Sequence, residues 1–371
     1  MNPLTLENSK KIAPPSSPNN LKKKIRAAFF SYPTAFQSPG GGEVQLLKTK
    51  EFLEKTGVEV KLFDPWVDKL ASFDLLHIFG SVKDCLDMIR TAKVLGVKTV
   101  LSTICWYSWH SAWGIYSSPA QRSLSVARHI GKAFFPFIPS LRKSMMDYSD
   151  LLYPNSQSEA EQLKRFFCMP EKRIFVVPNG TDERFVQANA AEFTDRYGLE
   201  NFILCVGRIE PRKNQLQMIR ALKGTKIPIV FIGDYVHCYR QYYIDCRREA
   251  DSNVYFLNSL GHESSLLASA YAACNTFLLA SWLETPGLAA LEAGLAGAKV
   301  VITDQGATQE YFSDYATYVK PHDLRGIRAK TLATFEAPKD TRLKDHILHH
   351  FMWDHAAERT LKGYRALLGE T

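Results

Sequence analysis

Two glutamates on either side of a helix start form the stretch with the clearest potential for chemistry. Glu284 and Glu292 lie eight positions apart, and Pro286 and Gly287 between them lead into a run of alanine and leucine. Proline followed by good helix formers predicts a helix start, so Glu284 precedes the helix and Glu292 lies about one and a half turns inside it. The backbone amides of Gly287 and Leu288 then point out of a helix N-terminus, which favours a bound anion.

A carboxylate on each side of an anion site suits a ligand with phosphate in its middle and hydroxyl groups at both ends. A nucleotide sugar has this chemistry. The alternative is an ordinary loop and helix of an α/β domain, because glutamate is common in the first turn of a helix on dipole grounds. These residues alone leave both interpretations open.

A pair of cations occurs earlier in the same half of the chain. The apolar run at 202–206 is followed by Gly207 and Arg208, and Lys213 comes five residues later, where the next helix is expected. Two cations at a strand end and a helix start suit a diphosphate. The alternative is a solvated surface loop, and the presence of both glutamates in the same half weakens it.

The elements that must position these residues follow an alternating plan. From Ile25 onward, short apolar runs alternate with longer amphipathic segments, and a second such series starts near residue 201. This alternation predicts an α/β chain with two doubly wound, Rossmann-like domains, in which ligands bind beyond the carboxyl ends of the strands. The predicted parts are a disordered tail at 1–24, an N-terminal domain at 25–180, a connection at 181–200, a C-terminal domain at 201–350 and a terminal helix at 351–371.

Composition sets the broad class of the chain. A length of 371 residues, with 46% hydrophobic and 23% charged residues, predicts a soluble globular protein of about two domains. The net charge of +8 favours an anionic partner, such as a nucleotide, an anionic lipid surface or nucleic acid. Seven dispersed cysteines without CxxC spacing indicate reduced thiols and a cytoplasmic setting. We see no membrane-spanning run and no secretory signal.

Residues 106–146 interrupt the alternation. This stretch mixes aromatic, bulky aliphatic and basic residues, including five cations between 122 and 143. An apolar cluster among the cations could enter a membrane interface while the cations meet anionic head groups. The alternative is an insertion packed on the N-terminal sheet, and two prolines at 136 and 139 break any continuous amphipathic helix. The cluster consists of Phe134, Phe135, Phe137, Ile138 and Leu141.

Taken together, these motifs resemble a known family. The segment GRIEPRKN at 207–214 is similar to a Gly-Arg-x4-Lys loop, ETPGLAALEAG at 284–294 to a Glu-x7-Glu motif, and VPNGTDERF at 177–185 to an interdomain signature. All three occur in the retaining family-4 glycosyltransferases, the glycosyl transferases group 1, which have the GT-B fold. GGGE at 40–43, YFLNSLGH at 255–262, GATQE at 306–310 and the terminal helix also fit. The similarity covers most of the chain from about residue 25.

The resemblance implies a role for each matching residue. Arg208 and Lys213 would hold the donor phosphates, with the amides of Gly287 and Leu288 on the distal phosphate. Glu292 would hold the ribose hydroxyls and Glu284 the hydroxyls of the donor sugar. The remaining donor-binding residues implied are Gly261 and His262 near the base, and Gly41 and Gly42 facing the donor from the N-terminal domain.

The N-terminal half departs from the family pattern. Many members place a histidine in a Thr-x-His segment facing the sugar, where this chain has Thr103, Ile104 and Cys105. Cysteine is a weak hydrogen-bond partner and cannot replace an imidazole. His110, in the aromatic loop that follows, is the candidate to take the catalytic place, and a packing or acceptor-side role is its alternative. His77 matches the first histidine of a His-x-His pair whose second member is Phe79 here.

The expected function is retaining transfer from a nucleotide sugar to a glycan or lipid-linked acceptor, in the cytoplasm or at the cytoplasmic membrane surface. Two cations and a helix N-terminus stabilise the departing diphosphate, and no Asp-x-Asp segment occurs, so no metal or other cofactor is expected. The histidines at 346, 349, 350 and 355 lack supporting carboxylates, which disfavours a metal site. No nucleic-acid-binding module is recognisable. The alternatives are a non-catalytic subunit that binds a nucleotide sugar or a partner enzyme, and a GT-B epimerase, for which no acid/base pair is evident.

Overall fold

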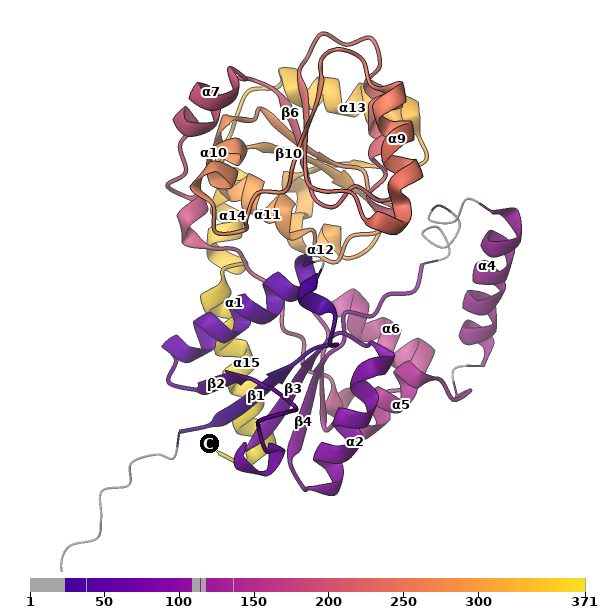
Figure 1. Cartoon of the computed structure of the whole chain (residues 1–371), viewed down its shortest axis with the longest axis vertical. Coiled ribbons are helices and arrows are strands. Elements are labelled where there is room, and N and C mark those ends of the chain that lie inside the picture. The colour runs from indigo at the N-terminus through magenta and orange to yellow at the C-terminus, as the bar shows by residue number, and fades with distance from the viewer. Residues whose placement is uncertain (1–23, 38, 109–113, 115–117, 136, 371) are drawn as a thin grey trace, which may run out of the picture.

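The structure is a computed structural model, and it describes residues 24–37, 39–108, 114, 118–135 and 137–370. Two α/β domains stack one above the other, each built on its own parallel sheet (Figure 1). The predicted pair of doubly wound domains is confirmed. The apolar runs are strands because β-branched and aromatic residues pack well on a pleated surface that helices cover on both faces.

The N-terminal sheet has the order β2-β1-β3-β4-β5, and all its neighbouring strands run parallel. Its strands are β1 (Arg26–Phe30), β2 (Glu59–Leu62), β3 (Leu75–Phe79), β4 (Lys98–Ser102) and β5 (Leu151–Tyr153). The helices of this half are α1 (Gly41–Lys55), α2 (Leu86–Val94), α4 (Pro119–Phe134), α5 (Leu141–Tyr148) and α6 (Gln157–Phe167). The order reverses between β1 and β3, which is where a doubly wound sheet opens a crevice for ligands.

The C-terminal sheet has the order β11-β10-β9-β6-β7-β8 and is parallel as well. Its strands are β6 (Ile203–Val206), β7 (Ile229–Ile232), β8 (Val254–Leu257), β9 (Thr276–Leu279), β10 (Lys299–Thr303) and β11 (Thr317–Val319). Its helices are α7 (Ala191–Tyr197), α8 (Gln215–Leu222), α9 (Arg240–Glu249), α10 (Ser265–Ala273), α11 (Leu288–Leu295), α12 (Thr308–Phe312), α13 (Leu324–Glu336) and α14 (Arg342–His350). Here the order reverses between β6 and β9.

Each face of the N-terminal sheet has its own apolar core. Along β1, Ala27 and Phe29 belong to one core and Ala28 to the other, as the alternation of side chains along a strand requires. The C-terminal domain has one large core, to which Phe193 of α7 contributes. Residues 191–197, inside the stretch expected as a connection, therefore pack as part of the C-terminal domain.

The terminal helix α15 (Trp353–Leu368) crosses back and lies along the N-terminal domain, next to α1 (Figure 1). Its Trp353 and Tyr364 are buried in the core on that side of the N-terminal sheet. Gly363 allows the close approach, because a Cβ atom there would lie 2.0 Å from the Tyr153 hydroxyl. The chain thus passes between the domains twice, once before α7 and once before α15.

Helix α4 stands away from the N-terminal sheet, at the right of Figure 1. Its sequence is strongly amphipathic, and Leu124, Ile130 and Phe134 are all more than half exposed. The helix ends at Phe134, and α5 begins at Leu141 with the Ser140 side chain capping it. None of the helices in the described ranges is long and apolar enough to cross a membrane.

Candidate active site

The charged residues of the C-terminal domain meet where β6 and β9 end, at the point where the strand order reverses. Arg208 follows β6, Lys213 closes the short 3-10 helix Pro211–Lys213, and Glu284 lies in the loop after β9. Neighbouring parallel strands bring their carboxyl ends to one edge, so residues 71 positions apart in sequence come into contact. A crevice at such a reversal is the usual ligand site of an open α/β sheet.

Lys213 and Glu284 form a buried ion pair. The Lys213 ammonium lies 2.7 Å from the Glu284 carboxylate, and the two side chains are 15% and 5% exposed. Burial alone raises the pKa of Glu284, but Lys213 and Arg212 outweigh it and hold the pKa below its ordinary value. Glu284 is therefore an ionised carboxylate at neutral pH, fixed by the cation beside it.

The backbone around Glu284 is held from the neighbouring loop after β10. The Glu284 amide donates to the Gln305 carbonyl at 3.2 Å, and the Ala307 amide donates to the Glu284 carbonyl at 3.1 Å. Gly306 makes this possible, since its φ is +105° and a Cβ there would lie 1.9 Å from the Glu284 carbonyl oxygen. The GATQE segment thus frames the site, although no side chain of it was predicted to act there.

Helix α11 starts beside this pair, as the Pro-Gly signal predicted. Its N-cap is Gly287, at φ +93°, and no side chain caps the first turn. The amides at this end are free of a side-chain cap, which is the arrangement an anion needs. Leu288 is the first helical residue and Glu292 the fifth.

The N-terminal domain meets the site through its glycine loop. A Cβ atom on Gly40 would lie 3.4 Å from the guanidinium carbon of Arg208, and one on Gly41 would lie 3.7 Å from the Leu288 side chain. Gly42 faces Ile104, the neighbour of Cys105, in the same way. The start of α1 thus lies next to Arg208 and to the start of α11.

Glu292 is held by two side chains of the C-terminal domain. The carboxylate is 6% exposed, and the His262 Nε2 and the Tyr271 hydroxyl each lie 2.8 Å from one of its oxygens. Tyr271 is fully buried, and burial holds its pKa well above the ordinary value, so the hydroxyl donates. Gly261 and His262 follow β8 and thus lie at the same edge as Glu292. Sequence reasoning missed Tyr271, since it lies in an apolar helix segment typical of a core.

The chain is similar to known glycosyltransferases. Residues 187–342 match the family described as Glycosyl transferases group 1. The C-terminal domain belongs to the glycosyl transferases group 1. A D-inositol 3-phosphate glycosyltransferase of Stackebrandtia nassauensis is 28% identical over 318 residues, which cover 74% of this chain and 70% of that protein. An O-antigen chain mannosyltransferase B of Escherichia coli is 24% identical over 249 residues, covering 62% of this chain and 63% of that protein.

Solved structures show the fold of the whole chain. A sucrose-phosphate synthase from Thermosynechococcus elongatus superposes with a TM-score of 0.71 at 16% identity, over 94% of this chain and all of that one. The Anabaena protein HepE in complex with UDP-glucose superposes with a TM-score of 0.69 at 16% identity, over 92% of this chain and all of that one. The fold is GT-B. The matching family and the curated relatives are glycosyltransferases, and the chain is an enzyme of this kind.

The N-terminal side of the glycosyltransferase site is built without the family histidine. Cys105 is buried, and its amide donates at 2.6 Å to the carboxylate of Glu159, which also accepts from the Thr103 hydroxyl at 2.5 Å. Glu159 is 1% exposed, and burial raises its pKa. The network fixes the loop after β4, so this loop is ordered without an imidazole. His110 lies outside the described residues.

His77 has a structural place in the glycosyltransferase. Its ring is buried between β1, Phe79 and the terminal helix, with Nδ1 2.5 Å from the Tyr364 hydroxyl and Nε2 2.9 Å from the Ser102 hydroxyl. Burial lowers the pKa of His77 to about 3, so the ring is neutral. The histidine matched to the family pair therefore joins the terminal helix to the sheet.

His346 and His350 lie on α14. His346 contacts the Tyr311 carbonyl at 3.1 Å, and its ring lies beside that of His350. Within the described ranges, no group of three or more histidine, cysteine or carboxylate side chains could hold a metal ion.

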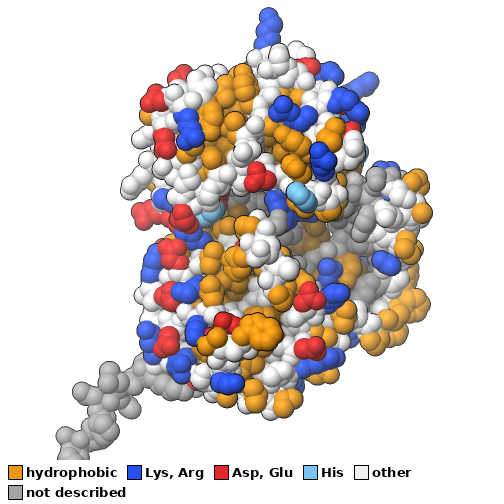
Figure 2. All heavy atoms as spheres, in the orientation of Figure 1, with side chains coloured by type: hydrophobic (Ala, Val, Ile, Leu, Met, Phe, Trp, Pro, Cys, Tyr) orange, Lys and Arg blue, Asp and Glu red, His pale blue; other side chains and the backbone are white. Residues whose placement is uncertain are grey.

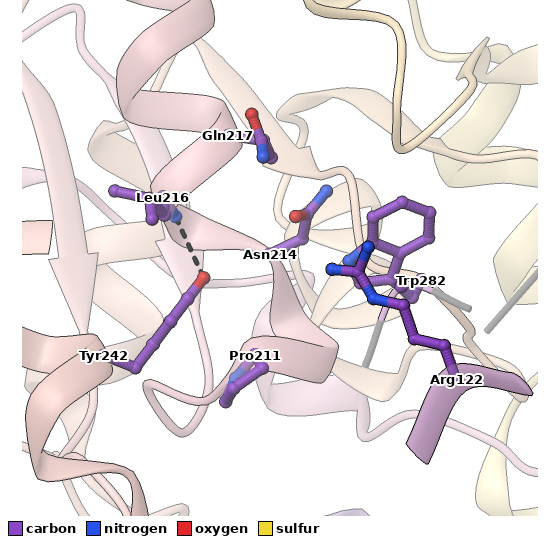
Figure 3. A pocket seen from close by; sticks show the side chains of 8 residues that line it. Arg122, Pro211, Asn214, Leu216, Gln217, Tyr242 and Trp282 are labelled. Carbon is purple, nitrogen blue, oxygen red and sulfur yellow. Dashed lines mark hydrogen bonds between the residues drawn. The ribbon is translucent and has the colours of Figure 1, made fainter. Parts of the chain in front are cut away.

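A small cavity lies on the other side of the Lys213 loop, between α4 and the C-terminal domain (Figure 3). Its volume is about 210 Å³. In Figure 3 the Arg122 side chain extends from α4 toward the indole ring of Trp282, two residues before Glu284. Helix α4 thus reaches the C-terminal domain next to the loop that carries Glu284. The lining includes Arg122, Pro211, Asn214, Gln217, Tyr242 and Trp282.

Proposed function

We propose that this glycosyltransferase moves a sugar, with retention of configuration and without a metal ion, from a nucleoside diphosphate to a glycan or lipid-linked acceptor. The observation that carries the proposal is the buried pair of Lys213 and Glu284 beside Arg208 and the uncapped start of α11. The donor diphosphate would lie on Lys213, Arg208 and the α11 amides. The donor sugar would lie against Glu284 and the ribose against Glu292.

The chemistry needs positive charge where the diphosphate departs. The bond between the anomeric carbon and the diphosphate oxygen breaks, and negative charge grows on the leaving group as the acceptor hydroxyl oxygen bonds to that carbon. The proton of the acceptor hydroxyl would pass to the departing diphosphate. Fixed cations and a helix N-terminus stabilise this charge without reorganisation. Lys213 would exchange part of its contact with Glu284 for the phosphate, which releases carboxylate lone pairs for the sugar hydroxyls.

Binding and turnover test the donor assignment separately. We expect one of the UDP-, GDP-, ADP- or dTDP-sugars to raise the thermal midpoint of the wild type, since a ligand of the folded state stabilises it. The same donor should release its nucleoside diphosphate slowly without acceptor, at equal rates with and without EDTA. Glu284→Gln should bind donor and release none. Turnover of Glu284→Gln at the wild-type rate would refute the site assignment, and loss of release in EDTA would refute metal independence.

The exposed apolar side chains of α4 and the loop after it support an acceptor or partner at a membrane surface. Phe134 is 73% exposed and Phe137 66% exposed, and Figure 2 shows hydrophobic side chains gathered at the right, over the place of α4. Arg128 on α4 is exposed as well. Exposed aromatic and basic side chains on one amphipathic helix suit an anionic lipid surface. The free cysteines agree with a location at the cytoplasmic face.

Sedimentation with vesicles of phosphatidylcholine and phosphatidylglycerol tests the membrane contact. The wild type should sediment, and a Phe134→Ser, Phe137→Ser double variant should remain in the supernatant. Val94→Ser is the matched control, since Val94 is 86% exposed on α2. Equal sedimentation of the double variant and the wild type would remove this part of the proposal.

A further inference from the structure

A cluster of charges joins the two domains close to the carboxylate that we assign to the ribose. Figure 2 shows acidic and basic side chains crowded at the waist between the domains. At the centre of this cluster of charges is Lys48 of α1, which belongs to the N-terminal domain. Its side chain is only 5% exposed, so the ammonium is a buried charge that needs partners.

The three protons of the Lys48 ammonium have three carboxylate partners. Its Nζ lies 2.9 Å from Glu51 on the same helix, 2.8 Å from Asp182 between the domains and 3.0 Å from Glu263 of the C-terminal domain. An ammonium donates three hydrogen bonds, so this set is complete. The hydrogen bonds raise the pKa of Lys48 although its burial opposes this, and it stays charged. Lys48 therefore ties α1 to the loop after β8.

Glu263 continues the contact to His262. One oxygen of the Glu263 carboxylate lies 3.1 Å from His262 Nδ1, and this is the oxygen that also faces Lys48. Arg184 donates to the other oxygen at 2.8 Å and to the His262 carbonyl at 2.6 Å. The imidazole is thus held on its Nδ1 side by the charges at the domain junction.

His262 in turn faces Glu292 with its other nitrogen. Nε2 lies 2.8 Å from the Glu292 carboxylate, which Tyr271 holds from the opposite oxygen. A carboxylate has about four acceptor positions, so two remain for the hydroxyls of a ribose. The orientation of these two positions depends on where His262 and Tyr271 hold the group. Tyr271 belongs to the C-terminal core, whereas His262 is connected to α1.

One helix is therefore connected to both ends of the donor site, directly at its start and through Glu263 and His262 at Lys48. The start of α1 faces Arg208 and Leu288, and Lys48 lies two turns further along, about 10 Å away at 1.5 Å per residue. We propose that Lys48 is a positioning residue for the donor site, which acts through Glu263 and His262 to orient Glu292 toward the ribose. The affinity for the nucleotide then depends on a residue of the opposite domain. This inference rests on the proposed role of Glu292.

Calorimetric titration of the full chain with UDP, GDP, ADP and dTDP tests the proposal. Using the diphosphate that the wild type binds, we expect Lys48→Met to weaken binding about fivefold or more, in the range of ordinary coupling between sites. Glu263→Gln should weaken it similarly, and the double variant no further than either single one, since both break one connection. In turnover, Lys48→Met should raise the donor KM and leave kcat nearly unchanged.

Controls separate this inference from folding and from the donor assignment. Lys50→Met is the matched control on the same helix, because Lys50 pairs with Glu54 of its own helix at 2.6 Å; it should bind as the wild type does. A lower thermal midpoint of Lys48→Met with unchanged nucleotide affinity would overturn the positioning role. Additive losses in the double variant would overturn it too. Wild-type affinity of Glu292→Gln, or no binding of any of the four diphosphates, would instead refute the ribose assignment and the inference with it.

Discussion

The pair of Lys213 and Glu284 leads to a prediction that separates the stability of the fold from the affinity for the nucleotide. Both side chains are largely buried and 2.7 Å apart. Removing one partner of such a pair costs about 3–5 kcal/mol, since the other charge stays buried and unpaired. Arg212 lies 4.0 Å from the same carboxylate and offsets part of the loss. We therefore expect Lys213→Met to lower the unfolding free energy by about 2–3 kcal/mol.

The double variant Lys213→Met, Glu284→Gln should recover most of this stability, because no charge of the pair is then left uncompensated. Its nucleotide affinity should not recover. A hydrogen bond to a charged group contributes about 1.5–3 kcal/mol, so loss of the lysine contact to phosphate weakens binding roughly tenfold to a hundredfold. A role confined to folding predicts the opposite, with affinity and stability returning together.

The assay pairs thermal unfolding without ligand with calorimetric titration of the bound nucleoside diphosphate. For a domain of this size, 2–3 kcal/mol corresponds to a midpoint lower by roughly 5–10 °C. An unchanged midpoint of Lys213→Met would show that the pair is not a buried ion pair in solution. Unchanged affinity of the double variant would show that Lys213 does not contact the phosphates.

Three further predictions concern contacts that hold the terminal helix and the two domains in place. Since burial lowers the pKa of His77 to about 3, its contribution to stability is present above pH 6.5 and is lost as the pH falls from 6.5 toward 3. The unfolding free energy of the wild type relative to His77→Gln, measured with urea, should shrink by about 2 kcal/mol between pH 8 and pH 5; a difference independent of pH would contradict this. Gly363→Ala should lower the thermal midpoint, because its Cβ would lie 2.0 Å from the Tyr153 hydroxyl, whereas Gly131→Ala, with open space around it, should not. Equal midpoints of the two alanine variants would show that α15 can shift without loss. Glu310→Gln should lower the unfolding free energy by roughly 0.5–1 kcal/mol, since Glu310 accepts at 2.7 Å from both the Gln157 and the Ser158 amides across the domain junction. A thermal midpoint equal to that of the wild type would count against this contact.

The sequence predicted the parts of the site that depend on local signals. Alternating apolar runs gave the two parallel sheets, and the Pro-Gly pair gave the start of α11. Lys213 and Glu284 then meet, and Arg208 follows β6 at the same edge, because parallel strands end at one edge. This rule needs no knowledge of packing. Glu292 lies inside α11, about where the predicted helix start placed it.

The residues that sequence reasoning missed owe their places to contacts between distant segments. Lys48 lies on an amphipathic helix, where a lysine is ordinarily solvated, yet its partners Asp182 and Glu263 are 134 and 215 positions away. Tyr271 has the sequence neighbours of a core residue. The carboxylate to which its hydroxyl donates, that of Glu292, is brought to it by the packing of α11. His77 matched a family histidine, but its partner Tyr364 lies 287 positions along the chain, on the terminal helix.

The departure at Cys105 has a physical consequence for the proposed chemistry. Glu159 accepts hydrogen bonds from the Thr103 hydroxyl and the Cys105 amide, so the loop in which the resemblance implies an imidazole is fixed by a buried carboxylate instead. Burial raises the pKa of the Glu159 carboxyl, and hydrogen bonds from the loop hold the carboxyl in its buried place. In the proposed function, positive charge for transfer would come from Arg208, Lys213 and the α11 amides of the opposite domain. The N-terminal domain then contributes by position, through the glycine loop on Arg208 and through Lys48.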